Sequence, residues 1–176
     1  MKFIKQKIKN LYLIKPSPFK DRRGIFRRNF CYNLQKKNQL NGNVRQANIS
    51  ENFKKLTLRG FHYQKYPYGE DKTLCCIKGE IYNVTIDLRK SSKTYKQWKG
   101  FYLNDKNRYL VHIPKGCANA FLTLKDNTIV HYYCSQNYNP KAERGIRYND
   151  KKFNIKWPKK PNIISKKDLK HEDFSE

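Results

Sequence analysis

The sequence predicts an all-β protein, an antiparallel jelly roll or barrel with a few short helices. Three observations support this fold class. Aromatic residues make up 14% of the chain, with 13 Tyr and 10 Phe, whereas Ala is scarce. Val, Ile and Thr recur in short runs, which favours strands over helices. Turns containing Gly and Pro separate these runs at regular intervals, a pattern typical of sandwiches and barrels.

Strand-like runs recur along the chain and are bounded by Gly, Pro, Asn or Asp. In order, they are residues 11–14, 44–50, 54–64, 72–77, 81–88, 97–103, 109–113, 119–124 and 128–135. The alternation is clearest over residues 81–88, where Val84 and Ile86 share one face and Asn83 and Asp87 share the other. Because one face is apolar and the other mixed, we expect this strand to form part of a barrel wall with one face exposed to solvent.

Helical segments are few. Residues 29–40 predict one short helix, and residues 165–170 predict about one helical turn. That turn lies in an otherwise irregular tail over residues 158–176, and residues 1–10 form a basic lead-in. Neither an internal repeat nor a low-complexity linker divides the sequence, so we expect a single domain over residues 1–176.

The charge of the chain is strongly basic, with 39 Lys and Arg against 14 Asp and Glu, a formal net charge of +25. Such a charge suits a nucleic-acid partner. However, the basic residues are spread over the whole chain, and no helix-turn-helix, zinc-finger or RNA-binding signature accompanies them. A lysine-rich composition explains the charge best, followed by an anionic small ligand, and both explain it better than a nucleic-acid partner. We therefore expect no nucleic-acid partner, with a non-catalytic basic binding protein as an alternative.

The cysteines and the hydropathy pattern point to the cytoplasm. The five cysteines are odd in number and lack CxxC spacing, so we expect reduced thiols. No apolar run approaches the roughly 18 residues of a membrane helix, and no signal-peptide pattern follows the basic start. We therefore expect no membrane contact. Since His62 is not part of a His-x-His pair and Asn119 is a poor metal ligand, we also expect no bound metal.

The sequence Leu-Arg-Gly-Phe-His-Tyr-Gln at residues 58–64 is the candidate centre of function. Histidine is a natural general base at neutral pH, although a histidine between aromatic residues is more often a packed strand residue. Arg59 and His62 are three positions apart, so a regular strand would point them to opposite faces. If both serve one pocket, an irregularity at Gly60 is needed, and we predict one there.

Several motifs, in matching order, resemble the dTDP-4-dehydrorhamnose 3,5-epimerase family, whose members are cupin-type jelly rolls. They are Asp-Arg-Arg-Gly at 21–24 with Phe26, Gln46-x-Asn48-x-Ser50, residues 58–64, Lys72, residues 79–89, Trp98, residues 113–121, residues 138–150, Trp157-Pro158 and residues 165–168. The resemblance covers most of the chain, from about Phe19 to Asp168. It implies a cofactor-independent epimerase that inverts C3, C5 or both in a nucleotide-diphosphate 4-keto sugar, during surface-polysaccharide biosynthesis. The sugar would be a dTDP-linked 4-keto-6-deoxyhexose or a GDP-linked hexose or heptose. A related cupin sugar 3,4-ketoisomerase is the alternative.

The resemblance also implies a role for individual residues. His62 would be the base that removes a proton beside the ketone, and Asp168 would hold its ring. Lys72 would stabilise the enolate, and Tyr132 would return a proton from the opposite face. The positions that match substrate-binding sites are Arg23, Arg28, Gln46, Asn48, Arg59, Asn83, Asn119, Tyr138 and Glu143.

Three of these positions depart from the pattern of the family. Asn119 stands where a histidine is usual, Asn83 where an aspartate is usual and Arg28 where a glutamate is common. We expect proton transfer to survive, but the nucleotide base and the number of inverted centres stay open. The resemblance further implies a homodimer in which residues 1–18 are exchanged between partners. We expect His171 to be a mobile tail residue.

Overall fold

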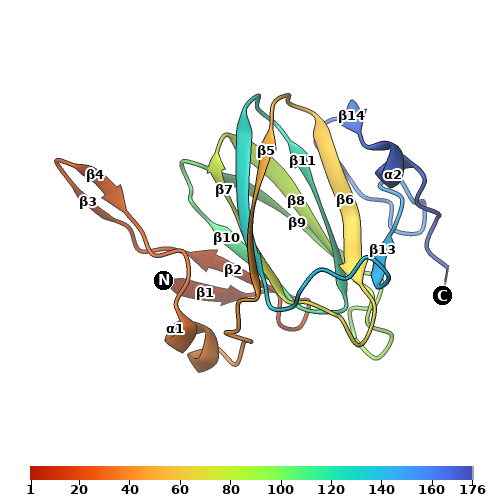
Figure 1. Ribbon diagram of the computed structural model, residues 1–176, viewed down its shortest axis with the longest axis horizontal. Helices are drawn as coiled ribbons and strands as arrows, with labels where there is room; N and C mark the ends of the chain where they lie inside the picture. Colours follow the sequence, from red (N-terminus) through yellow and green to blue (C-terminus); the bar gives the residue numbers. More distant parts are fainter. Residues whose placement is uncertain (176) are drawn as a thin grey trace.

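The computed structural model describes residues 1–175 and contains two β-sheets that face each other as in a jelly roll (Figure 1). The first sheet has the order β1 (Lys2–Lys5), β2 (Tyr12–Lys15), β10 (Leu110–Ile113), β7 (Lys72–Lys78), β12 (Thr128–Cys134) and β5 (Gln46–Asn52). The second has the order β13 (Glu143–Gly145), β6 (Thr57–Gln64), β11 (Cys117–Thr123), β8 (Glu80–Asp87) and β9 (Trp98–Asn104). The predicted fold class is therefore confirmed.

The remaining elements are not part of the two strand orders given above. β3 (Phe19–Asp21) and β4 (Gly24–Phe26) form a hairpin that projects away from the sheets, at the left of Figure 1. The helix α1 (Tyr32–Lys37) follows, within the predicted helical range. The chain end supplies β14 (Ile163–Ile164), which runs parallel to β6, and α2 (Lys166–Leu169), the predicted helical turn. The lead-in is itself a strand, β1, because it pairs with β2.

The space between the sheets is filled by apolar side chains, since each strand turns every second residue inward. This core consists of Ile8, Leu11, Leu74, Cys76, Ile81, Phe101, Leu103, Val111, Ile113, Cys117, Phe121 and Val130. A second cluster covers the outer face of the second sheet, where the segment after β13 packs. Its buried members are Phe61, Val84, Ile86, Ala118, Ala120, Ile146 and Phe153. The sheet that carries residues 58–64 is thus buried on both faces.

The prediction that one face of residues 81–88 is exposed to solvent is wrong. Asn83, Thr85 and Asp87, on the mixed face of β8, are all 0% exposed. Polar neighbours compensate much of this burial, because Asp87 accepts hydrogen bonds from Arg89, Ser92 and Thr94. Alternation along one strand predicts which side chains share a face, but not what covers that face.

β6 is irregular at Gly60, as predicted. Its partner β11 places Asn119 opposite His62 and Phe121 opposite Arg59, so two residues of β6 face a single residue of β11. Gly60 has φ +107°, and a Cβ there would lie 2.5 Å from the carbonyl oxygen of Asn119. The extra residue changes the parity of the strand, and both Arg59 and His62 line the same cavity.

None of the helices among residues 1–175 has the length and apolar character needed to cross a bilayer.

Candidate active site

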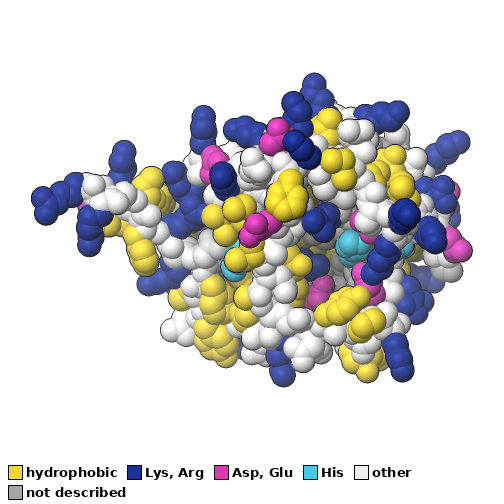
Figure 2. Space-filling view, turned by 45° about the horizontal axis from the view of Figure 1, so that its top comes forward, with side chains coloured by type: hydrophobic (Ala, Val, Ile, Leu, Met, Phe, Trp, Pro, Cys, Tyr) yellow, Lys and Arg dark blue, Asp and Glu magenta, His cyan; other side chains and the backbone are white. Residues whose placement is uncertain are grey.

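A cleft opens between the two sheets beside β6. One part has a volume of about 330 Å³ and the next about 300 Å³, and His62, Lys72 and Tyr132 line both. Figure 2 shows a hollow on this face, with histidine, acidic and hydrophobic side chains around it and Lys and Arg scattered over the surrounding surface. The cleft therefore brings together three of the four residues predicted to be catalytic.

The fourth predicted catalytic residue, Asp168, binds the ring of His62. Nε2 of His62 donates to Oδ1 of Asp168 at 2.8 Å, and the backbone N–H of Gly60 donates to Oδ2 at 3.0 Å. Burial by itself would raise the pKa of Asp168, but the His62 ring and the Gly60 N–H outweigh it, so the pKa lies below its ordinary value. An ionised carboxylate fixes Nε2 as the protonated nitrogen, which leaves Nδ1 of His62 for proton exchange.

Asp168 reaches this position because of local capping. Ser165 precedes α2, and its Oγ accepts from the backbone N–H of Asp168 at 3.0 Å. β14 pairs with the start of β6, so the short helix that follows lies behind His62. The carboxylate is 5% exposed, whereas the His62 side chain is 34% exposed toward the cleft.

Lys72 and Tyr132 belong to the opposite sheet. The ammonium of Lys72 lies 3.1 Å from Oε1 of Glu70 and 5.5 Å from the centre of the Tyr132 ring. Burial would lower the pKa of Lys72, but the charge of Glu70 raises it above its ordinary value, so Lys72 is a cation. Burial raises the pKa of Tyr132, and Lys72 offsets only part of that rise, so the phenol keeps its proton. Base and phenol thus enter the cleft from different sheets.

Most of the predicted substrate-binding residues surround the same cleft. Arg59 and Asn119 line the first part, and Gln46, Asn48, Tyr138 and Glu143 line the second. Nε of Arg59 donates to Asn52 at 2.8 Å, which steadies the guanidinium at the cavity wall.

Asn119, at the wall of the cleft, forms a neutral pair with Asn83 behind it. Nδ2 of Asn119 donates to Oδ1 of Asn83 at 2.6 Å and to the carbonyl of Val84 at 3.0 Å. Asn83 is fully buried and does not line the cleft, and its Nδ2 lacks a hydrogen-bond partner within residues 1–175. Asn83 therefore acts on the cleft only through Asn119.

Arg23 and Arg28 do not lie at the cleft of their own chain. Arg23 is at the tip of the projecting hairpin, where its side chain is 83% exposed and pairs with Asp21. Arg28 follows the hairpin and is exposed. Their predicted role at the substrate therefore needs contact with another copy of the chain.

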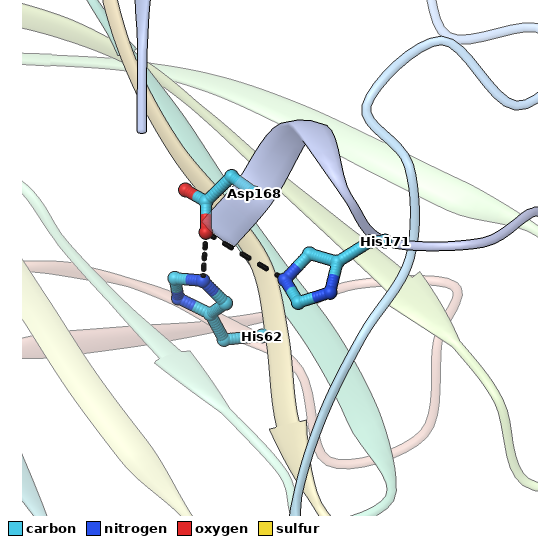
Figure 3. A group of neighbouring side chains, drawn as sticks. All are labelled: His62, Asp168 and His171. Atoms are coloured by element: carbon cyan, nitrogen blue, oxygen red, sulfur yellow. Dashed lines mark hydrogen bonds and ion pairs between the residues drawn. The ribbon is translucent and has the colours of Figure 1, made fainter. Parts of the chain in front are cut away.

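The prediction for His171 is wrong. Its Nε2 lies 3.6 Å from Oδ1 of Asp168, its ring meets the His62 ring edge-on at 5.8 Å, and its side chain is 15% exposed. Figure 3 shows both imidazoles directed at the same carboxylate oxygen. Sequence reasoning missed this residue because it lies in a polar tail without periodicity. Its spacing of three residues from Asp168 on a helical turn was the one available signal.

Comparison with known proteins identifies the family of the chain. Residues 5–176 match the family model described as dTDP-4-dehydrorhamnose 3,5-epimerase. The enzyme of that name from Methanothermobacter thermautotrophicus is 39% identical over 171 residues, which cover 95% of this chain and 91% of that protein. The chain belongs to the dTDP-4-dehydrorhamnose 3,5-epimerase family.

Two solved structures of the dTDP-4-dehydrorhamnose 3,5-epimerase family carry ligands. The enzyme from Bacillus anthracis, with TDP and PPi bound, has a TM-score of 0.95 and 34% identity, covering 98% of this chain and 99% of that one. The enzyme from Legionella pneumophila, in complex with dTDP-4-keto-L-rhamnose, has a TM-score of 0.92 and 31% identity, covering 98% and 92%. The fold of this epimerase family thus extends over almost the whole chain.

Proposed function

We propose that this chain inverts carbon centres beside the ketone of a nucleotide-diphosphate 4-keto sugar, with His62 as base and Tyr132 as acid. The observation that carries the proposal is the pair of groups across one cleft. His62 backed by Asp168 enters from β6, and Tyr132 beside Lys72 enters from the other sheet. Removing and returning a proton leaves the oxidation level of the sugar unchanged, so the reaction needs no redox cofactor.

The first step is removal of the proton from a carbon next to the ketone. Nδ1 of His62 accepts it, while the carboxylate of Asp168 keeps Nε2 protonated and stabilises the imidazolium that forms. The electron pair moves into the carbonyl and gives an enolate. Lys72 is a cation in a half-enclosed site, where it stabilises the developing charge on oxygen.

The second step returns a proton to the opposite face of the enolate carbon. The Tyr132 hydroxyl keeps its proton because burial raises its pKa, and an enolate is basic enough to take it. Because Tyr132 and His62 lie on facing sheets, return from Tyr132 inverts the centre, whereas return from His62 restores it.

The Asn119–Asn83 pair bears on how many centres are inverted. An amide cannot donate or accept a proton near neutral pH, so Asn119 orients the substrate but does not exchange protons with it. Inversion of both C3 and C5 then depends on His62 and Tyr132 alone, with the sugar turning between the two events. Inversion of a single centre requires no such turn and is the simpler outcome at this site.

The hairpin β3–β4 supports assembly as a homodimer. Phe19 and Phe26 are 62% and 72% exposed on it, although aromatic side chains of this size are normally covered. A second copy would cover them and bring Arg23 near a neighbouring cleft, where its guanidinium suits a diphosphate.

The proposal is tested with purified chain and a dTDP-linked 4-keto-6-deoxyhexose in deuterated water. We expect NMR to show deuterium at one or both carbons that flank the ketone, with inverted configuration. Movement of the carbonyl to C3 would instead identify a ketoisomerase. A thermal-shift series with dTDP, GDP, UDP and CDP selects the nucleotide, since the cognate base raises the melting temperature most. If nucleotide sugars neither bind nor exchange protons, the proposal is wrong.

A further inference from the structure

His171 remains outside the proposed reaction, yet it contacts the residue that holds the base. From this geometry we infer that His62, Asp168 and His171 form a site for a divalent transition-metal ion such as Zn²⁺, and that the ion inhibits the enzyme. Binding at this site does not depend on the proposed function, whereas the inhibition rests on it.

The spacing of the three ligand atoms suits such an ion. One oxygen of Asp168 lies 2.8 Å from Nε2 of His62 and 3.6 Å from Nε2 of His171, and all three atoms lie within 4.8 Å of one another (Figure 3). Zinc binds nitrogen and carboxylate oxygen at about 2.0–2.2 Å, so its ligands stand roughly 3.4 Å apart around a tetrahedral ion. Shifts of about 1 Å in the two rings bring the donors to that distance. Two imidazoles and a carboxylate are also ligand types that zinc, cobalt and nickel accept.

The Nε2 atom of His171 is buried and has no hydrogen-bond partner among the described residues. A buried polar atom without a partner is unfavourable, and most such atoms in folded proteins are paired. The ring directs this nitrogen at an oxygen of Asp168 that His62 already occupies. A metal ion between the three groups would give the nitrogen a partner.

The surrounding chain holds His171 in place. Nε of Arg147 donates to the carbonyl of His171 at 3.2 Å, and the N–H of Phe174 donates to Asp150 at 2.6 Å. The ring lies against Gly145, where a Cβ would come 2.1 Å from Nε2 of His171. His171 is therefore part of the packed structure, and Gly145 provides the space for its ring.

Occupation of the site would remove the base from catalysis. A metal ion takes the lone pair of Nε2 of His62, so the ring proton moves to Nδ1 and that nitrogen can no longer accept one. The ion also takes the carboxylate of Asp168, which otherwise stabilises the imidazolium. A pocket of about 380 Å³ lined by His62, Ser165 and Asp168 leaves room for water to complete the coordination.

Binding is measured by calorimetric titration of the EDTA-treated full-length protein with Zn²⁺. We expect one ion per chain, and H171Q should weaken the affinity by at least about tenfold. G145A should weaken it as well, because the added methyl group displaces the His171 ring. H131Q is the matched control and should bind as the wild type does, since His131 contacts Asn29 and not this cluster. Circular dichroism verifies that each variant is folded.

The cysteines are the competing ligands, because all five are free. Titration with Co²⁺ separates the two cases, since thiolate ligands add an intense near-ultraviolet charge-transfer band that imidazole and carboxylate do not. We expect the visible bands of Co²⁺ without the thiolate band. A thiolate band, equal Zn²⁺ affinity in H171Q and wild type, or no binding in the wild type would each overturn the inference.

Inhibition is measured separately, as the rate with Zn²⁺ relative to the metal-free rate of the same variant. Zn²⁺ should inhibit the wild type and H131Q at concentrations that leave H171Q at its own metal-free rate. If the chain binds Zn²⁺ as described but shows no epimerase activity, only the proposed function fails. If it is an active epimerase but H171Q is inhibited like the wild type, only the metal site fails.

Discussion

Nε2 of His62 lies 2.8 Å from Oδ1 of Asp168, although 106 positions separate the two residues in the sequence. β14 and α2 close this distance, because β14 pairs with β6 and α2 begins at the Ser165 cap. The end of the chain is therefore needed to complete the proposed base, and changes there should affect catalysis as well as stability.

The substitution D168N should remove most of the activity while leaving the fold intact. The asparagine oxygen can still accept from Gly60, but its NH₂ group faces Nε2 of His62 and favours the wrong tautomer. We expect kcat to fall by roughly 10²- to 10⁴-fold. Initial rates and the melting temperature are measured together. A variant that retains its melting temperature and works within tenfold of the wild type would contradict the role of Asp168.

The substitution Y132F should separate proton removal from inversion. Without the hydroxyl, a proton can return only from the His62 face, so the substrate exchanges with solvent but keeps its configuration. We expect inversion to slow by about 100-fold or more. Mass spectrometry and NMR of the recovered sugar distinguish exchange from inversion.

Y133F is the matched control for Y132F. The Tyr133 hydroxyl donates to the carbonyl of Asn29 at 3.2 Å and lies away from the cleft. Its loss should lower the free energy of unfolding by about 1 kcal/mol and leave inversion unchanged. If Y132F inverts at the rate of Y133F, Tyr132 is not the acid.

Mixing two impaired variants tests whether Arg23 serves the cleft of a second copy. R23A and H62A should each have little activity, but a dimer of one R23A chain with one H62A chain has one intact site. We expect co-refolded mixtures to regain up to about a quarter of wild-type activity, from the statistics of random pairing. If Arg23 instead acts in the cleft of its own chain, the mixtures should be no more active than R23A or H62A alone.

The buried carboxylate of Asp87 should make stability depend on pH in the acid range. Burial would raise its pKa, but the hydrogen bonds from Arg89, Ser92 and Thr94 lower it from 3.8 to about 2. The unfolded chain therefore binds the proton first as the pH falls. The stabilisation is complete above about pH 4 and is lost as the pH falls toward 2.

D87N measures this contribution by chemical denaturation. At pH 7 the substitution should lower the free energy of unfolding by about 2 kcal/mol, and the difference from the wild type should shrink as the pH approaches 2. D126N is the control, because Asp126 is exposed and an asparagine can still accept from the backbone of Lys55. A constant difference between D87N and wild type from pH 7 to pH 2 would show that the ionisation of Asp87 is not responsible.

The sequence allowed much of the fold to be predicted, because strand pairing leaves a local pattern. Alternation and turn residues located most strands of the two sheets, but not β1, β13 or β14. The parity of Arg59 and His62 predicted the irregularity at Gly60. What covers a strand is set by distant segments. The burial of Thr85 therefore left no local signal, and His171 left only its spacing of three residues from Asp168.

The candidate site was predictable for a different reason. A general base can be proposed from chemistry, but Lys72 and Tyr132 are two among many lysines and tyrosines, and only the motif order singled them out. The cleft then joins them to His62. The role of Arg23 in substrate binding stays a prediction. Arg23 is exposed and does not line the cleft of its own chain, so it can act only if a second copy of the chain binds.

The most direct test of the central claim is deuterium incorporation beside the ketone of the sugar, compared between H62Q and H131Q. His131 points to the opposite face of its strand from Tyr132, so H131Q should exchange at the wild-type rate. H62Q should exchange at least about 10³-fold more slowly, because the glutamine amide cannot accept a proton near neutral pH. Exchange in H62Q at the rate of H131Q, with both proteins folded, would show that His62 does not remove the proton.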